Sequence, residues 1–582
     1  MSVHNEEIAR IFDEMAERLA LQNENPFRIR AYQRAALSVR GQRRELSDLI
    51  RQSTDAGEEP RAALDAVPGI GADLAGKILE IVTTGRCKAL ERLRKQVPAG
   101  LLDLLHLPGL GPKRVQTLYT QLKVGSRRDL ERAVQAQALA KVRGLGRKLN
   151  ERLARELKVI LPQEKRWLRS IAQQFAEPLA AHLRAVPGVD RVTIAGSYRR
   201  GRETVGDLDI LVSATDAAPV TQALHRYDEI VSWAAEGPKR VTVSLRSGLQ
   251  VDLRISEPEC FGAALHYFTG SKAHNIHIRR MAQERGLKIN EYGVFRGRRR
   301  IAGRTEESVF DAVDLPSIPV EMREDQGEIE LARAGKLPRL VTREDLRGDL
   351  HCHTKATDGQ ESLETMARAA QAAGLEYLAI TDHSKYLGMV KGLDERRLRQ
   401  QMETIDRLND RLDITLLKGI EVDILEDGKL ALPDDLLTEL DVVVAAIHSH
   451  FDLSEQRQTE RVLRAMEHRA FTILGHPSSR LIGERHAIAL DFQRVCVAAK
   501  ERPCYLELDG QPDRLDLDDA HCRVAREQGV LVSIASDAHH SAQFENLNYG
   551  VVQARRGWLR AQDVLNTKPL KEVRRLLRAA MM

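Results

Sequence analysis

The sequence is short of the features that mark secreted and membrane proteins. Its 582 residues include only six cysteines, scattered along the chain without a CxxC pair. This usage excludes a disulfide scaffold and indicates reduced thiols, as in the cytosol. The chain lacks any run of about eighteen apolar residues, so no membrane span is expected. Its start, MSVHNEEIAR, contains no apolar segment, and no signal peptide is expected.

A large net charge is also absent, because the formal charge at pH 7 is only +5. The charge is unevenly placed, however: residues 1–160 hold 29 Lys and Arg against 20 Asp and Glu. A polyanionic partner requires such a basic region, although a solvated helical surface can have the same composition. Histidine is uneven too, since eleven of the eighteen lie after residue 350. That asymmetry points to metal chemistry in the C-terminal part.

The hydrophobic periodicity changes along the chain. Residues 1–160 show 3.6-residue patterns typical of helices. In the region of residues 190–255, the segments RVTIAGS, DLDILVS, RVTVSLRS and LQVDLRIS alternate with period two, as strands do. The segment 318–346 is polar and punctuated by Pro and Gly, which predicts a linker. After it, seven short apolar segments alternate with helical stretches, which favours a (β/α)-barrel. The candidate strands are 347–353, 375–382, 413–422, 441–449, 471–476, 504–509 and 530–537.

Three turns between predicted helices share a Gly-apolar-Gly form. They lie in VPGIGADLAGKI (67–78), LPGLGPKRVQTL (107–118) and VRGLGRKLNERL (142–153). Glycines permit a tight turn with exposed backbone N–H groups at a helix N-terminus, and such a turn binds a DNA phosphate without reading sequence. One copy alone would fit a helix C-cap, but three copies in a basic region resemble helix-hairpin-helix motifs. The glycines concerned are Gly69, Gly71, Gly109, Gly111, Gly144 and Gly146.

Three aspartates on predicted strands form the first candidate catalytic site. Asp207 and Asp209 lie two residues apart in GDLDI, so both carboxylates face the same side of a strand, and Asp252 follows in QVDLRI. Three carboxylates on adjacent strands can hold two divalent cations about 3.5–4 Å apart, as in-line phosphoryl transfer needs. Alternating aspartates by themselves favour a solvated strand face. The preceding Gly196-Ser197 turn together with the third aspartate favours the catalytic alternative.

These motifs resemble the family X DNA polymerases, such as DNA polymerase beta. The likeness covers roughly residues 1–315 and includes GSYRRG, GDLDI, VDLRI and HYFTGSKAHNIHIRRMAQERGLKINEYG. It implies that the three aspartates are the catalytic carboxylates and hold Mg²⁺ or Mn²⁺. It implies dNTPs and gapped or nicked double-stranded DNA with a 5′-phosphate as substrates. It assigns the nucleotide, sugar and template contacts to Gly196, Ser197, Arg200, Gly206, Tyr267, Phe268, Gly270, Asn275 and Arg279.

The N-terminal part resembles the small lyase domain of the same family. The segment NPFRIRAYQRAA matches its helix and places Arg28 and Tyr32 near the 5′-phosphate. Lys77 falls where the family has its Schiff-base lysine, whose amine would attack a deoxyribose aldehyde. The alternative is a phosphate-binding lysine on a helix. Asp73 stands where the family has a phosphate-contacting lysine, which weakens the predicted pocket.

The second candidate site lies at the ends of the C-terminal strands. Six of the seven predicted strands end in a potential metal ligand, and in such barrels these ends converge on one face. The set HCHT, TDHS, GIE, IHSH, GHP and SDAH resembles the polymerase-and-histidinol-phosphatase (PHP) domain over about 347–582. All nine ligand positions of that family are filled, by His351, His353, Asp358, His383, Glu421, His448, His476, Asp537 and His539.

The PHP resemblance implies up to three Zn²⁺ or Mn²⁺ ions and attack of an activated water on a phosphodiester. It groups His351, His353, Glu421 and Asp537 on one ion. It groups Glu421, His448 and His476 on a second, and Asp358, His383 and His539 on a third. A single histidine is more often a core or surface residue, and we assign His450, His468, His486, His521 and His540 to that class.

We therefore expect a multidomain fold. It combines N-terminal all-α helix-hairpin-helix domains, an α+β nucleotidyltransferase palm like that of DNA polymerase beta, and a C-terminal distorted (β/α)7 PHP barrel. The expected parts are a lyase-like domain (1–84), a DNA-binding helical domain (85–160), the palm (161–258), a thumb-like nucleotide-selection subdomain (259–317), the linker (318–346) and the PHP domain (347–582).

The expected function is that of a family X DNA polymerase that fills short gaps in base excision repair. The PHP domain would add 3′–5′ exonuclease, 3′-end processing and AP endonuclease activity. Two alternatives stay open: a template-independent nucleotidyltransferase, and a DNA-binding phosphoesterase with an inactive palm. We expect a monomer in the cytoplasm, associated with the nucleoid through DNA.

Overall fold

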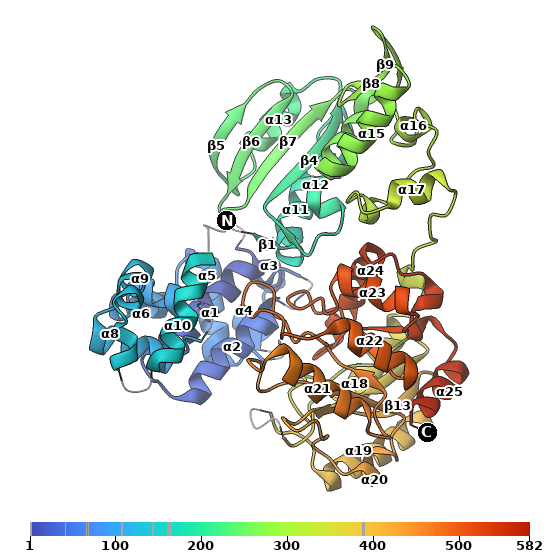
Figure 1. The fold of residues 1–582 in the computed structure, drawn as a ribbon. Helices are drawn as coiled ribbons and strands as arrows, with labels where there is room; N and C mark the ends of the chain where they lie inside the picture. The colour runs from blue at the N-terminus through green and yellow to red at the C-terminus, as the bar shows by residue number, and fades with distance from the viewer. Residues whose placement is uncertain are drawn as a thin grey trace. The chain divides into compact units, whose positions relative to one another are not determined.

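The chain folds into two compact units, residues 1–165 and 166–582, whose helices and strands are drawn in Figure 1. The structure, a computed structural model, describes residues 3–40, 42, 44–65, 67, 69–105, 107, 109–142, 145–159, 166–386 and 390–581. Within these ranges, none of the helices has the length and apolar character of a membrane span. The two units are described separately.

The described residues of the first unit form helices alone. They are α1 (Asn5–Leu21), α2 (Pro26–Arg40), α3 (Leu46–Asp55), α4 (Pro60–Asp65), α5 (Ala72–Thr84), α6 (Lys88–Gln96), α7 (Ala99–Leu105), α8 (Pro112–Leu122), α9 (Arg127–Gln135), the 3-10 helix η1 (Ala138–Lys141) and α10 (Gly146–Val159). Phe12, Met15 and Ile78 belong to one apolar core. Leu104 and Leu118 belong to a second. These two helical cores confirm the predicted all-α helix-hairpin-helix architecture.

A five-stranded sheet begins the second unit. Its order is β2 (Val189–Ile194), β4 (Asp207–Ala214), β7 (Gln250–Ser256), β6 (Arg240–Leu245) and β5 (Ile230–Glu236). Leu208, Ile210 and Val212 alternate along β4 and pack into one core with the helices α11 (Arg169–Arg184) and α13 (Ala218–His225). The alternation that predicted strands β2, β4, β6 and β7 is thereby confirmed, whereas the edge strand β5 was not predicted. Short elements complete this part: β1 (Trp167–Leu168), α12 (Gly196–Arg199) and β3 (Thr204–Val205).

The next part joins helices to a small hairpin sheet. It contains η2 (Pro258–Cys260), α14 (Phe261–Thr269), α15 (Lys272–Glu284), β8 (Leu287–Asn290), β9 (Gly293–Arg296), β10 (Arg299–Ala302) and α16 (Glu307–Asp311). The predicted linker 318–346 is folded here, as η3 (Val320–Met322), α17 (Glu328–Arg333) and η4 (Arg343–Asp345). Ile318, Met322 and Ile329 are buried in one apolar core with Trp558 from near the C-terminus. This segment therefore ties the middle of the chain to its end.

Seven parallel strands form the C-terminal barrel. In order they are β11 (Gly348–Asp349), β12 (Tyr377–Ile380), β13 (Thr415–Asp423), β14 (Val442–Ala446), β15 (Ile473–Leu474), β16 (Tyr505–Asp509) and β17 (Val532–Ala535). The intervening and following helices are α18 (Leu363–Ala372), α19 (Glu395–Asn409), α20 (Asp434–Leu437), α21 (Glu455–Met466), α22 (Phe492–Glu501), α23 (Asp519–Gln528), α24 (Asn546–Arg556) and α25 (Leu570–Ala580). A parallel bridge between Cys352 and Ala538 joins the first strand to the seventh. The backbone N–H of His353 donates to the Ala538 carbonyl at 2.8 Å. The sheet thus curls into the predicted (β/α)7 barrel.

Candidate active sites

The three predicted aspartates lie together at the start of two neighbouring strands. The parallel pairing of β4 with β7 sets Asp209 directly opposite Asp252, and Asp207 lies two residues earlier on β4. Gly196 lies very close to the carboxylate of Asp209: a Cβ built on Gly196 would be 2.1 Å from Oδ2 of Asp209. Only glycine leaves the room for this approach, and its φ of +59° suits it as well.

Burial and the neighbouring carboxylates both act on Asp209. Burial raises the pKa of Asp209 to about 7, with further contributions from the carboxylates of Asp207 and Asp252. Asp252 is held in place by the hydroxyl of Thr242, which donates to it at 2.5 Å, and by the amide of Gln250 at 3.2 Å. Crowded carboxylate oxygens are what Mg²⁺ and Mn²⁺ prefer, so the donor set fits the expected cations.

The raised pKa of Asp209 predicts a stability change in the metal-free protein. Its pKa rises from 3.8 to about 7 on folding, so the wild type loses stability relative to an asparagine variant as the pH rises between these values. In a chelating buffer, Asp209→Asn is therefore expected to melt roughly 5 °C higher than wild type at pH 8, with a smaller gain at pH 5. Thermal unfolding at both pH values measures the difference. Asp228→Asn, at an exposed position, is the control, and an equal Asp209→Asn gain at both pH values would contradict the prediction.

Arg200, predicted to contact the triphosphate, is held between the palm and the following helices. Its Nη1 donates to the carbonyl of Thr269 at 2.5 Å, and its Nε donates to Oε1 of Glu324 at 3.1 Å. A Cβ on Gly270 would lie 3.0 Å from Nη1 of Arg200, so these two predicted residues are neighbours. Ser197 lies in the short helix α12. Gly206 directly precedes β4.

The predicted sugar and base contacts lie on two consecutive helices. Tyr267 and Phe268, in α14, have ring centroids 5.1 Å apart in an edge-to-face arrangement. The side-chain amide of Asn275, in α15, donates to the carbonyl of Tyr267 at 2.7 Å. Nε of Arg279 donates to the carbonyl of Asn275 at 3.3 Å. These four residues therefore form one connected group.

The glycines of the three Gly-rich turns have two distinct roles. Gly69 and Gly109 adopt positive φ values of +82° and +87°. Gly71 and Gly111 are the N-caps of α5 and α8, where free backbone N–H groups are available to a phosphate. In the third turn, Gly146 begins α10, and Gly144 lies outside the described residues.

The predicted lyase residues are partly brought together. Lys77 Nζ lies 5.9 Å from the ring centroid of Tyr32 and donates to Oδ1 of Asp73 at 2.5 Å. Arg28 pairs instead with Glu24 at 3.4 Å on the exposed surface. Schiff-base chemistry needs a free amine, so the Lys77–Asp73 pair would have to open first.

One carboxylate lies at the centre of the histidine-rich barrel mouth. Oε1 of Glu421 is 3.1 Å from Nε2 of His448 and 3.0 Å from Nε2 of His476. Its Oε2 is 2.7 Å from Nδ1 of His383 and 3.5 Å from Nε2 of both His351 and His353. Asp537 continues the group, since its Oδ1 is 3.0 Å from Nε2 of His353 and 3.6 Å from Nε2 of His351.

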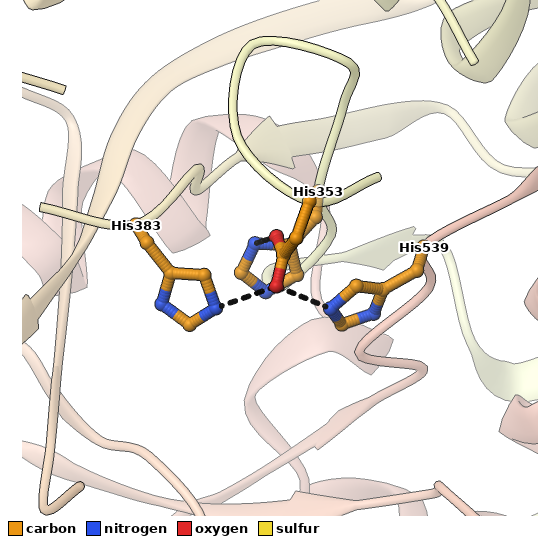
Figure 2. Close-up of side chains that lie close together, drawn as sticks. His353, His383 and His539 are labelled. Atoms are coloured by element: carbon orange, nitrogen blue, oxygen red, sulfur yellow. Dashed lines mark ion pairs between the residues drawn. The ribbon is translucent and has the colours of Figure 1, made fainter. Parts of the chain in front are cut away.

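The last two predicted ligands, Asp358 and His539, lie beside His353 and His383, and Figure 2 shows these three histidines around one carboxylate. Oδ2 of Asp358 lies 3.3 Å from Nε2 of His383 and 3.4 Å from Nε2 of His539, and these two ion pairs are drawn as dashed lines. The His353 ring lies between the other two, with ring centroids 4.5 Å from His383 and 4.3 Å from His539. The described residues offer three sets of ligand atoms close enough for an ion. They are His353, Asp358, His383 and His539; His351, His353 and Asp537; and His383, Glu421 and His448.

The imidazoles and carboxylates of this mouth shift one another's pKa values. Burial would lower the pKa of His539, but the Asp358 carboxylate raises it to about 9. Burial would raise the pKa of Glu421, but the surrounding histidines, His383 first, hold it well below its usual range. Oε2 of Glu421 and Oδ1 of Asp537 are buried and accept no well-oriented hydrogen bond. Cations fit such a set, and imidazole with carboxylate suits Zn²⁺ or Mn²⁺.

Known families match five separate segments of the chain between residues 3 and 509. The N-terminal residues match a helix-hairpin-helix domain (3–87) and a SAM-like helix-hairpin-helix tandem (101–158). The DNA polymerase beta palm matches residues 167–248, the DNA polymerase beta thumb 264–324, and the PHP domain 349–509. A Bacillus subtilis (strain 168) protein, the DNA polymerase/3′-5′ exonuclease PolX, is 36% identical over 581 residues, which cover 99% of this chain and 100% of that protein. The chain belongs to the family X DNA polymerases.

Other relatives match separate parts of this family X chain. DNA polymerase lambda of Arabidopsis thaliana is 27% identical over 289 residues, which cover 44% of this chain and 52% of that protein. A probable phosphatase of Thermoanaerobacter sp. (strain X514) is 28% identical over 239 residues, which cover 38% of this chain and 89% of that protein. Proteins named as polymerases and as phosphatases thus both resemble this chain.

Two carboxylates that orient histidines of this family X protein, Glu507 and Asp423, were not predicted. Oε2 of Glu507 lies 2.7 Å from Nδ1 of His351, and Oδ1 of Asp423 lies 3.0 Å from Nδ1 of His448. Such contacts fix the ring and the tautomer of a metal ligand. A sequence signal existed: Glu507 and Asp509 alternate on β16, the one strand without a predicted ligand, so both face the same side.

Proposed function

We propose that this chain is a DNA-directed DNA polymerase that fills short gaps during DNA repair and degrades or trims 3′ ends in its PHP domain. The observation that carries the proposal is the joint presence of two separate ligand sets in one chain. One is the aspartate trio of β4 and β7, and the other is the histidine-rich barrel mouth. The combined name of the full-length Bacillus subtilis relative supports both halves of the assignment.

In the palm, Asp207, Asp209 and Asp252 would hold two divalent cations, Mg²⁺ or Mn²⁺. Bound there, such cations supply activation of the primer 3′-hydroxyl and charge neutralisation of the triphosphate. The chain's own residues orient the reactants. Gly196 borders Asp209, and Ser197 follows it in α12. Arg200 would meet the triphosphate, and the α14–α15 group of Tyr267, Phe268, Asn275 and Arg279 would select the sugar and base. Positioning of this kind is the main contribution a protein makes to phosphoryl transfer.

In the barrel, the nine predicted ligands, of which all but His476 belong to the three ligand sets, would hold up to three Zn²⁺ or Mn²⁺ ions, which would supply an activated water for phosphodiester hydrolysis. Glu507 and Asp423 hold the rings of His351 and His448 in the orientation this needs. The bond broken is the 3′-terminal phosphodiester of a DNA strand, which makes this part a 3′–5′ exonuclease.

From the Gly-rich turns and Lys77 of the helical unit, we expect a preference for gapped DNA that carries a 5′-phosphate. If its turns and Lys77 grip that phosphate, removing it from a one-nucleotide gap should lower the efficiency of extension about tenfold. Primer extension on gapped duplexes with and without the 5′-phosphate measures the effect. Lys77→Ala should abolish the preference, whereas Lys88→Ala, an exposed lysine of the same unit, should keep it. Equal extension of gapped and plain primer–template DNA by the wild type would refute the gap-binding role.

A further inference from the structure

One helix of the PHP barrel packs directly against the turn that follows β2 of the palm. Gly201 ends that turn, and a Cβ built on it would lie 2.3 Å from Cγ1 of Val552 in α24. The hydroxyl of Tyr549, also in α24, donates to the side chain of Gln173 at 3.0 Å. The turn that carries Ser197 and Arg200 is therefore built against the barrel, and it tolerates no larger residue at position 201.

Arg556, at the end of α24, forms a direct hydrogen bond with the palm. Its side chain is 3% exposed, and its Nη1 donates to the backbone carbonyl of Arg200 at 2.9 Å. The same Nη1 lies 3.1 Å from Oε1 of Glu324, and Nη2 lies 2.6 Å from Oδ2 of Asp519. A buried guanidinium with three partners fixes them relative to one another, because loss of any contact would leave a buried charge less well paired.

Glu324 connects the two arginines. Its Oε1 accepts from Nε of Arg200 at 3.1 Å and from Nη1 of Arg556 at 3.1 Å. Arg556 thus acts on Arg200 twice, through the backbone carbonyl of Arg200 and through the carboxylate that holds its guanidinium. Asp519, the third partner of Arg556, belongs to α23 of the barrel, so the barrel in turn fixes Arg556.

We propose that Arg556, a residue of the PHP barrel, is a positioning residue of the nucleotidyl-transfer site. It holds the 196–201 turn and Glu324 so that Arg200 meets the triphosphate in one orientation. This inference rests on the proposed function, since it presumes that the palm adds nucleotides. Its consequence is that the domain with the nuclease site also sets the nucleotide affinity of the polymerase site.

The test compares Arg556→Ala and Arg556→Lys with wild type in the full-length chain. Arg556→Ala should raise the KM for the incoming dNTP about tenfold and change kcat much less, because one charge-assisted contact that orients the nucleotide site is lost. Arg556→Lys, which keeps the charge and one donor at a time, should recover part of the affinity. Nuclease activity on single-stranded DNA should stay within about twofold of wild type.

The neighbouring Arg555 provides a matched control. It lies on the same helix and pairs with Glu321 at 2.8 Å, and among the described residues its side-chain hydrogen bonds go to Glu321 and to the carbonyl of Val341, outside the 196–201 turn. Arg555→Ala should leave the KM for dNTP unchanged. An equal rise in KM for Arg555→Ala would mean that general loosening of the interface, and not positioning, is responsible, and it would overturn the proposal.

A second variant, outside the barrel, separates the proposed role of Arg556 from an effect of misfolding in the barrel. Glu324→Gln removes the shared carboxylate without altering α24 and should raise the KM for dNTP like Arg556→Ala. Unchanged KM values in both variants would refute the role of Arg556. Absence of synthesis by the wild type itself would instead refute the proposed function, so the two failures are distinguishable.

Discussion

Asp209→Asn is expected to lower nucleotide incorporation by about 10³-fold or more, because Asp209 is one of the three carboxylates that would hold the divalent cations, and its loss removes several kcal/mol of transition-state stabilisation. The geometry singles out this residue. Asp209 faces Asp252 in the strand register, lies against Gly196, and carries the raised pKa of the trio. Single-nucleotide incorporation into gapped DNA, measured with Mg²⁺ and with Mn²⁺, gives the rate.

Two comparisons make this result specific. Asp228→Asn, at an exposed position of the same domain, should incorporate nucleotides at the wild-type rate. Nuclease activity of Asp209→Asn on single-stranded DNA should remain. Undiminished synthesis by Asp209→Asn would overturn the palm assignment and favour a DNA-binding phosphoesterase with an inactive palm. Extension of a primer without a template by the wild type would favour a template-independent transferase.

Glu421→Gln is expected to reduce the nuclease rate by about 10³-fold or more, while synthesis on gapped DNA stays intact. Glu421 is the side chain that links the metal-ligand groups of the barrel. Its two oxygens contact His448 and His476 on one side and His383 on the other. An amide keeps the shape but loses the charge, so it binds a divalent cation weakly and leaves the imidazoles without their shared carboxylate.

The measurement is shortening of a 5′-labelled single strand, together with the metal content of the purified protein. Glu426→Gln is the matched control, since Glu426 follows the same strand but is exposed and pairs with Arg457 at 2.8 Å. It should retain full nuclease activity and metal content. A Glu421→Gln protein with normal nuclease activity would remove the barrel mouth from the nuclease role.

Regular alternation explains why much of the fold was predictable. The strands of the barrel are short, apolar and followed by polar ligands, and β4 and β7 alternate cleanly, so each could be located from the sequence. The edge strand β5 gives no such signal, because most of its residues are exposed and its sequence, IVSWAAE, does not alternate in polarity. The segment 318–346 looks like a linker because of its charges. Its few apolar residues, such as Ile318 and Met322, find their partner Trp558 more than 200 residues later, and no local pattern reveals that packing.

The candidate sites, like the fold, were predictable from the sequence only in part. Ligand positions were predictable because motifs at strand ends converge in a barrel. The orienting carboxylates were missed. Alternation along β16 marks the side that Glu507 faces, but a sequence does not distinguish a glutamate that orients one ring, as Glu507 does for His351, from one that contacts several, as Glu421 does. The pairing of Arg200 with Glu324 joins residues 124 positions apart, and a single sequence holds no trace of it.

The folded segment 318–346 and the docking of α24 make the palm and the barrel parts of one compact unit. Arg480 of the barrel also pairs with Glu203 beside the palm turn, at 2.7 Å. Under the proposed function, the two chemical centres therefore lie within one folded unit, and a 3′ end that is extended in the palm has to move to the barrel mouth to be trimmed.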